Sequence, residues 1–115
     1  MLGLVLDGAK RATASLVAEF AIEGQPLPRI GGHWIACDST GRPRVILRSI
    51  ELRIARFGDV DAAFAYDEGE DDRTLESWRE NHRRYWQRVA PTLGFEWTEQ
   101  HEIVLERFEV AWTAE

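Results

Sequence analysis

The spacing of hydrophobic positions changes several times along the chain, and each change predicts a different element. Residues 1–12 carry apolar side chains at helical spacing, which indicates the end of a helix. Residues 13–22 fit either a helix or an extended segment, and both interpretations stay open. Residues 24–32 contain Pro26 and Pro28 between glycines, so they predict a loop.

The middle of the chain is typical of a hairpin. Residues 33–38 predict a short strand, residues 39–42 a hairpin turn, and residues 43–57 a long strand or a bent pair of strands. The alternation of apolar and polar positions changes phase near Ser49, which predicts a bulge or a sharp bend. Such bends are common where strands curl around the core of a small barrel.

The second half predicts two helices and a final strand. We expect a short helix over 60–66, capped by Asp59 or Asp61, and a longer one from Thr74 to about Val89, capped by Asp72. One apolar face of the longer helix carries Leu75, Trp78, His82, Tyr85, Trp86 and Val89. We assign Trp86 to the core. Residues 67–72 form an acidic loop, 93–100 a second loop, and 103–112 a final strand. This order predicts an α+β domain with a mostly antiparallel, strongly curved sheet.

Composition indicates one globular domain without a membrane segment. The chain has 115 residues, of which 44% are hydrophobic and 30% charged, as in ordinary soluble domains. We expect no membrane span, because no apolar run reaches the necessary length, and no signal peptide, because the first residues lack a basic region. Cys37 is the only cysteine, so no intrachain disulfide can form, and we expect a cytoplasmic protein.

The formal net charge of -6 argues against broad binding to a nucleic-acid backbone. It favours a small substrate over a long RNA. Arginines nevertheless cluster over residues 42–56 and 79–88. The sequence therefore also allows a local basic groove that binds RNA.

Lys10 is the only lysine in the chain and suggests a chemical role. Arginine stays protonated at ordinary pH, whereas a desolvated lysine can lose its proton and act as a base. If the first helix continues through Thr13, the two side chains share one face. A threonine hydroxyl becomes a nucleophile when a neighbouring base takes its proton. The alternative is that Lys10 is a helix C-terminal cation and Thr13 a turn residue.

Three segments resemble one known family. Residues 8–16 (GAKRATASL) resemble the G-x-K-x-x-T signature of ASCH domains. Residues 64–82 resemble the acidic loop and helix of one ASCH subgroup, and residues 106–110 resemble its ending. The resemblance covers nearly the whole chain and implies a single ASCH domain over 1–115, with a PUA-like β-barrel and flanking helices.

The resemblance also implies a role near RNA or its nucleosides. Members of the subgroup usually carry an extra segment before the first motif, so the resemblance implies a shortened N-terminus here. A wall of the site would then be incomplete or supplied by another subunit. The sequence therefore also allows a dimer.

Some small ASCH proteins are amidohydrolases that act on acetylated cytidine, with a lysine, a threonine and a downstream glutamate as the catalytic set. The resemblance places these roles on Lys10, Thr13 and an acidic-loop carboxylate, with Glu70 preferred to Glu68. Asp71 fits an ungapped match but is the shorter acid. In this interpretation the lysine is the base, the threonine the nucleophile, and the carboxylate orients the ammonium or protonates the leaving group.

Several other side chains are candidates for binding a substrate. They are Arg11, Ser15, Glu68, Trp78, His82 and Tyr85. The aromatic ones could stack on a base, although aromatic residues at helical spacing are more often core, and His82 has a second interpretation as a buried, satisfied histidine. We expect no cofactor and no metal, since the acidic loop lacks EF-hand spacing and no His/Cys metal spacing appears.

Three functional hypotheses remain at this point. The first is binding of a nucleoside or RNA base with hydrolysis of an N-acyl group. The second is a non-catalytic RNA-binding module, and the third is a metal-independent ribonuclease that uses Lys10 and an acid.

Overall fold

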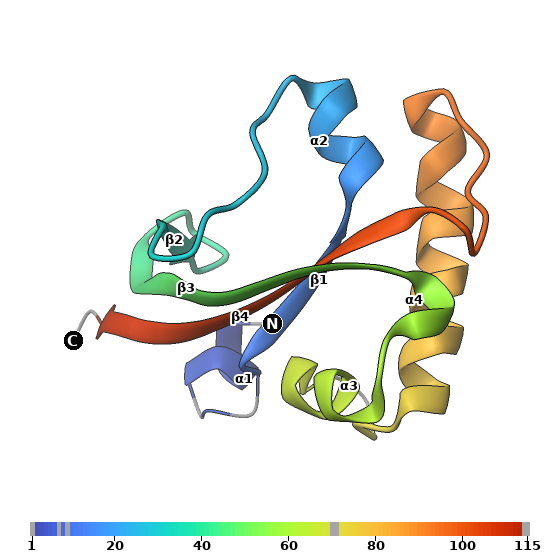
Figure 1. Cartoon of the computed structure of the whole chain (residues 1–115). Coiled ribbons are helices and arrows are strands. Elements are labelled where there is room, and N and C mark those ends of the chain that lie inside the picture. Colours follow the sequence, from blue (N-terminus) through green and yellow to red (C-terminus); the bar gives the residue numbers. More distant parts are fainter. Residues whose placement is uncertain (1, 7, 9, 70–71, 114–115) are drawn as a thin grey trace.

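A four-stranded antiparallel sheet forms the centre of the molecule (Figure 1). The computed structural model describes residues 2–6, 8, 10–69 and 72–113. The strand order is β1-β4-β3-β2, so the last strand of the sequence lies between β1 and β3. The strands are β1 (Ala12–Leu16), β2 (His33–Cys37), β3 (Pro43–Arg56) and β4 (Glu102–Thr113).

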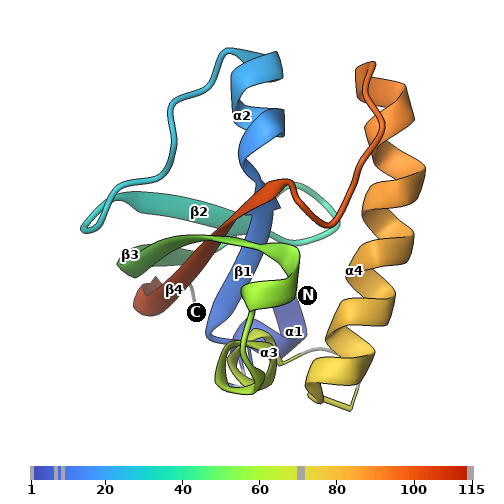
Figure 2. The same ribbon diagram turned by 45° about the vertical axis from the view of Figure 1, so that its right-hand side comes forward.

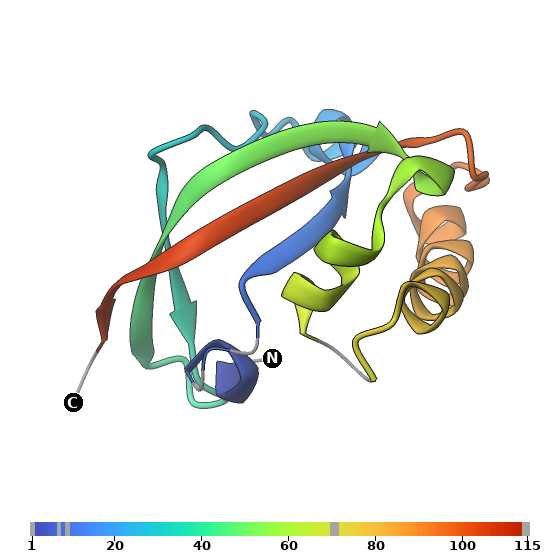
Figure 3. The ribbon, with the colours of Figure 1, turned by 60° about the horizontal axis from the view of Figure 1, so that its bottom comes forward.

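The sheet is strongly curled, and Figure 3 shows β3 and β4 arching over the molecule as a half-barrel. The register between β3 and β4 shifts at Ile46/Leu47 and again between Ser49 and Glu51. Each shift increases the local twist and bends the strand. The expected irregularity near Ser49 is therefore confirmed, and so are the α+β class and the curved antiparallel sheet.

Helices flank this sheet (Figure 2). They are α1 (Leu2–Leu6), α2 (Val17–Glu23), α3 (Ala62–Glu68) and α4 (Leu75–Val89), with two short 3-10 turns, η1 (Phe57–Asp59) and η2 (Ala90–Leu93). In Figure 2, α4 stands along one side of the sheet and α3 lies near its lower end. None of the helices in the described part of the chain has the length and apolar character that a membrane crossing requires.

The N-terminal segment differs from one expectation. The first helix ends at Leu6, and Ala12 already begins β1, so Lys10 and Thr13 do not share a helix. The ambiguous stretch 13–22 resolves into both alternatives: it is extended to Leu16 and helical from Val17.

The caps of α3 and α4 are side-chain hydrogen bonds. The Oδ1 of Asp61 accepts from the Phe64 amide at 2.8 Å, as one of the two expected caps would. At α4 the expectation of Asp72 is wrong, because the hydroxyl of Thr74 accepts from the Ser77 amide at 3.2 Å. Asp72 instead accepts from the amide and the hydroxyl of Thr74, at 3.0 and 2.7 Å, and so orients the capping residue.

Two apolar clusters lie on opposite faces of the sheet. The larger one packs one face against α3 and α4, and includes Phe57, Phe64, Trp86 and Leu105. Trp86 is 1% exposed, which confirms its assignment to the core. The smaller cluster contains Val5, Ala36, Val45, Leu47 and Phe108. The candidate site lies at the rim of the larger cluster, beside β1.

Candidate active site

A cavity of about 370 Å³ lies between β1, the end of α3 and the middle of α4. It is lined by Lys10, Thr13, Ala14, Glu68, Asn81, His82, Tyr85 and Trp86. Segments far apart in the sequence therefore meet at one place. Of the side chains suggested by the sequence, the structure brings together Lys10, Thr13, Glu68, His82 and Tyr85.

Lys10 is almost completely buried, with 3% of its surface exposed. Its Nζ donates a hydrogen bond to the backbone carbonyl of Glu68 at 3.3 Å. The backbone just after it is fixed as well, since the Arg11 amide donates to the Asp67 carbonyl at 2.6 Å and the Arg11 carbonyl accepts from the Phe108 amide at 3.0 Å. Lysine is rarely buried to this extent because an ammonium loses its hydration there. The fold thus places a desolvated amine at a fixed position in the cavity wall.

Glu68 of α3 and His82 of α4 line the same cavity. Glu68 is 2% exposed, and its Oε2 lies 3.1 Å from the Nε2 of His82. The two atoms are not aligned as a hydrogen bond, so the contact is electrostatic. The other ring nitrogen of His82 lies 2.9 Å from the Trp78 carbonyl. Because a carbonyl can only accept, we place a proton on Nδ1.

This arrangement constrains where a second proton sits. A separation of 3.1 Å between Nε2 and a buried carboxylate oxygen is favourable when the pair carries a proton, so we place a proton on one of the two groups. His82 also stacks on Trp78, with ring centroids 4.2 Å apart and planes 20° apart. The imidazole is therefore held in orientation by a hydrogen bond on one side and a ring on its face.

Thr13 comes from β1, at the edge of the sheet. It pairs with Glu106 of β4 and is one of the residues that line the cavity together with Lys10. Tyr85 is 47% exposed at the cavity and is the most accessible aromatic residue in its lining.

The remaining sequence candidates lie elsewhere. Arg11 is exposed and its Nε donates to the Gly8 carbonyl at 3.2 Å. Trp78 is 5% exposed and belongs to the core below His82, so it cannot stack on a ligand without moving. Ser15 lines a different cavity. Glu70, the preferred acid, and Asp71 lie outside the described residues.

Sequence reasoning missed Asn81, which lines the cavity next to His82 on α4. Its type and spacing are those of an ordinary polar helix residue, so the sequence carried no signal for it. Among the residues that the structure describes, no group of three His, Cys, Asp or Glu side chains is placed to hold a metal ion.

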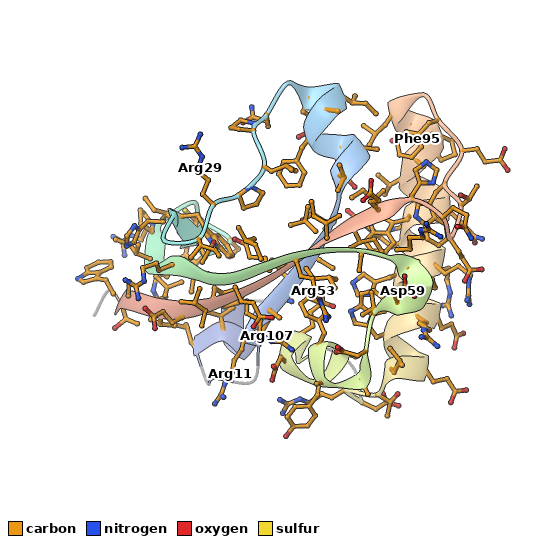
Figure 4. All side chains as sticks on the ribbon, in the orientation of Figure 1. Arg11, Arg29, Arg53, Asp59, Phe95 and Arg107 are labelled. Carbon is orange, nitrogen blue, oxygen red and sulfur yellow. The ribbon has the colours of Figure 1, made fainter. Side chains whose placement is uncertain are left out.

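Many arginines of the two sequence clusters are paired with acids. The pairs are Arg44–Asp38, Arg48–Glu109, Arg53–Asp61, Arg83–Glu99 and Arg84–Glu80. Figure 4 shows Arg53 and Arg107 on the same side of the molecule, near α3. Arginines already neutralised in this way offer less to a phosphate backbone than their number in the sequence indicates.

The curled antiparallel half-barrel with a lysine, a threonine and a carboxylate around an edge cavity defines a PUA-like α+β protein. The chain belongs to the ASCH domain family, whose model matches residues 1–111. It is similar to the crystal structure of an ASCH domain from Lactobacillus crispatus, with a TM-score of 0.87 and 33% identity, over 94% of this chain and 68% of that one.

A second solved relative is a protein from Enterococcus faecalis assigned to the family model DUF984. The TM-score is 0.82 and the identity 31%, over 94% of this chain and 64% of that one. No curated protein matches the chain. The family and the fold are thus shown, and the activity has to be inferred from the cavity itself.

Proposed function

We propose that this ASCH domain binds a modified nucleoside and hydrolyses its N-acyl group, as in acetylcytidine. The observation that supports this most is the burial of Lys10 in the wall of a cavity that Thr13 also lines. A desolvated amine next to a hydroxyl is the arrangement that activates a weak oxygen nucleophile. The pairing of many surface arginines with acids supports a small substrate rather than a long RNA.

In the proposed reaction the Thr13 hydroxyl attacks the acyl carbon while Lys10 takes its proton. The C–N bond then breaks, and the leaving nitrogen takes the proton held by the Glu68–His82 pair. Water next attacks the acyl-threonine and gives its proton back to that pair. The Thr13 oxygen leaves with the proton stored on Lys10, so the products are a carboxylic acid and the free amino-nucleoside, and both groups return to their starting states.

This mechanism changes the assignment of the acid. The resemblance preferred Glu70, whereas Glu68 is the described carboxylate that lines the cavity. The backbone carbonyl and the side-chain carboxylate of Glu68 have different roles in the proposed mechanism. The backbone carbonyl holds Lys10, and the carboxylate acts together with His82.

The experiment compares deacylation of acetylcytidine by matched variants. Thr13→Val keeps the branched shape but lacks the hydroxyl, and Lys10→Arg keeps the charge but cannot serve as a base. We expect kcat/KM to fall by about 10²-fold to 10⁴-fold in each, the usual loss when a positioned base is removed. Thr13→Ser should retain activity, because it keeps the hydroxyl.

Arg42→Met serves as the control for losing an exposed cation, because Arg42 lies in the turn between β2 and β3, away from the cavity. It should deacylate like the wild type. Activity retained in Thr13→Val would rule out the threonine as nucleophile. A wild-type protein that leaves acetylcytidine intact but cleaves or tightly binds a structured RNA would replace the proposal with one of the RNA hypotheses.

A further inference from the structure

A second and larger cavity, of about 700 Å³, opens on the other side of β1. Its walls include Phe20 of α2, the proline-containing loop between α2 and β2, and Trp34 of β2. Figure 4 shows Arg29 projecting from this loop. A cavity of this size, with an aromatic and proline wall facing several polar side chains, lies within the range of small-molecule sites.

One set of polar groups in this cavity surrounds a buried carboxylate, and Gln25, Arg29 and His33 line the cavity as well. Glu106 is 7% exposed and Ser49 is 2% exposed, and the Ser49 hydroxyl donates a hydrogen bond to the Oε2 of Glu106. Thr13 lies directly opposite Glu106 on the neighbouring strand, so both side chains point to the same face of the sheet. Ser15, two residues further along β1, adds a second hydroxyl on that face.

In the described part of the chain no cation is paired with this carboxylate, although Arg29 and His33 line the same cavity. The neighbouring Arg107 bonds to Glu51 and Asp67 instead. A buried carboxylate is costly unless donors replace its hydration, and one hydroxyl replaces only part of it. A ligand with an exocyclic N–H group would donate to the carboxylate in place of water.

The wall opposite the sheet is fixed rather than loose. Ser49, which lies beside the bulge, donates its amide hydrogen to the Gly32 carbonyl at 2.9 Å and accepts at its own carbonyl from the Gly31 amide at 2.7 Å. The bulge that brings the Ser49 hydroxyl to Glu106 therefore also attaches the end of the loop to β3. The cavity is built by the fold and needs no ligand to form.

We propose that this second cavity binds a flat heterocyclic ring and selects rings that present an exocyclic N–H, such as an amino group, to Glu106. The apolar body of the ring would lie between the aromatic and proline walls. Thr13 lines both cavities, so a substituent on the bound ring meets the Thr13 hydroxyl. This inference rests on the proposed function in that the ring is taken to be the base of the acylated nucleoside.

The test uses unreacting nucleosides, so it does not depend on catalysis. Binding of cytidine and uridine is measured by calorimetry on the wild type, Glu106→Gln and Glu109→Gln. Cytidine presents an amino group where uridine presents a carbonyl, which a carboxylate repels. We expect the wild type to bind cytidine at least tenfold more tightly than uridine, and Glu106→Gln to reduce that ratio to near one, because an amide can both donate and accept.

Glu109→Gln is the matched control. Glu109 lies on the same strand, half exposed and paired with Arg48, so its variant should keep the wild-type preference. A second readout is made on the wild type itself: the indole N–H signal of Trp34 should shift when cytidine is added, and Trp34→Phe is used only to assign that signal. Equal binding of the two nucleosides by the wild type, no binding of either, or a ratio unchanged in Glu106→Gln would overturn the inference.

The outcomes separate this inference from the catalytic proposal. Selective cytidine binding that depends on Glu106, together with an absence of deacylation, would support the ring-binding cavity and refute the proposed hydrolase activity. Deacylation of acetylcytidine with KM unchanged in Glu106→Gln would support the proposed hydrolase activity and refute the ring-binding cavity.

Discussion

Arg107 is the residue through which the sheet is expected to hold the candidate site in place. Its Nε donates to the Oδ2 of Asp67 at 3.0 Å, and its Nη1 donates to the Oε1 of Glu51 at 2.9 Å. The guanidinium also lies 5.4 Å from the centre of the Phe64 ring. Because Asp67 precedes Glu68 in α3, these contacts tie the end of that helix to β4. We predict that Arg107→Met destabilises the fold and loosens the site.

The magnitude follows from the exposure of the partners. The side chain of Arg107 is 21% exposed, that of Asp67 30% and that of Glu51 51%, so solvent screens both ion pairs. Pairs of this kind contribute about 0.2–1 kcal/mol each. The cation–ring contact adds about 0.5–1 kcal/mol. We therefore expect Arg107→Met to lower the free energy of unfolding by about 1–2 kcal/mol, which corresponds to a fall in Tm of about 4 °C per kcal/mol.

Urea denaturation of a double-mutant cycle with Asp67→Asn measures the pair itself. We expect a coupling energy of about 0.5–1 kcal/mol at low salt that shrinks in 1 M NaCl, where the screening length is about 3 Å. If the proposed function holds, kcat/KM of Arg107→Met should fall by more than the loss of folded protein explains, because small displacements of catalytic groups reduce the rate strongly. A coupling energy indistinguishable from zero at low salt would refute the view that Arg107 fixes α3 through Asp67.

Two further outcomes concern the helix caps. The amide of Phe64, and then the side chain of Arg53, hold the pKa of Asp61 below its ordinary value of 3.8, so its contribution to stability is present above pH 3.8 and is lost as the pH falls further. The stability difference between the wild type and Asp61→Asn should therefore shrink in acid denaturation below that pH, and a constant difference would contradict the assignment. Thr74→Ala should lower the free energy of unfolding, measured by thermal denaturation, by about 1 kcal/mol, whereas Thr74→Ser should change it little. Equal losses in the two variants would show that the hydroxyl does not cap α4.

The strands were predictable wherever one face is buried. Alternation along β3 marked both the strand and the break at Ser49, because a bulge shifts every later side chain to the other face. The apolar spacing of α4 likewise indicated that Trp86 is core. Residues 13–16 were not predictable as strand, since Ala, Thr and Ser have weak local preferences and only pairing with β4 makes them extended.

The composition of the site was harder to predict than its elements. The lysine and threonine were identified by a motif, but their proximity arises from a turn into a strand and not from a helical face. Glu68 could not be distinguished from its acidic neighbours, because its burial depends on where α3 ends against β1 and α4. The contact between Glu106 and Ser49 could not be predicted from the sequence, since only the bulge brings the serine to that carboxylate.

The strand order has a consequence for how the protein is made. β4 is the last strand in the sequence, yet it lies between β1 and β3, and β1 has no other strand partner in the described residues. During synthesis the first strand must therefore wait, unpaired, until residues 102–113 have left the ribosome. The half-barrel can close only as a late, long-range step, which is the slow kind of folding event. The lysine and the glutamate, 58 residues apart in the sequence, should consequently reach their final positions only after the strand over residues 102–113 has been made.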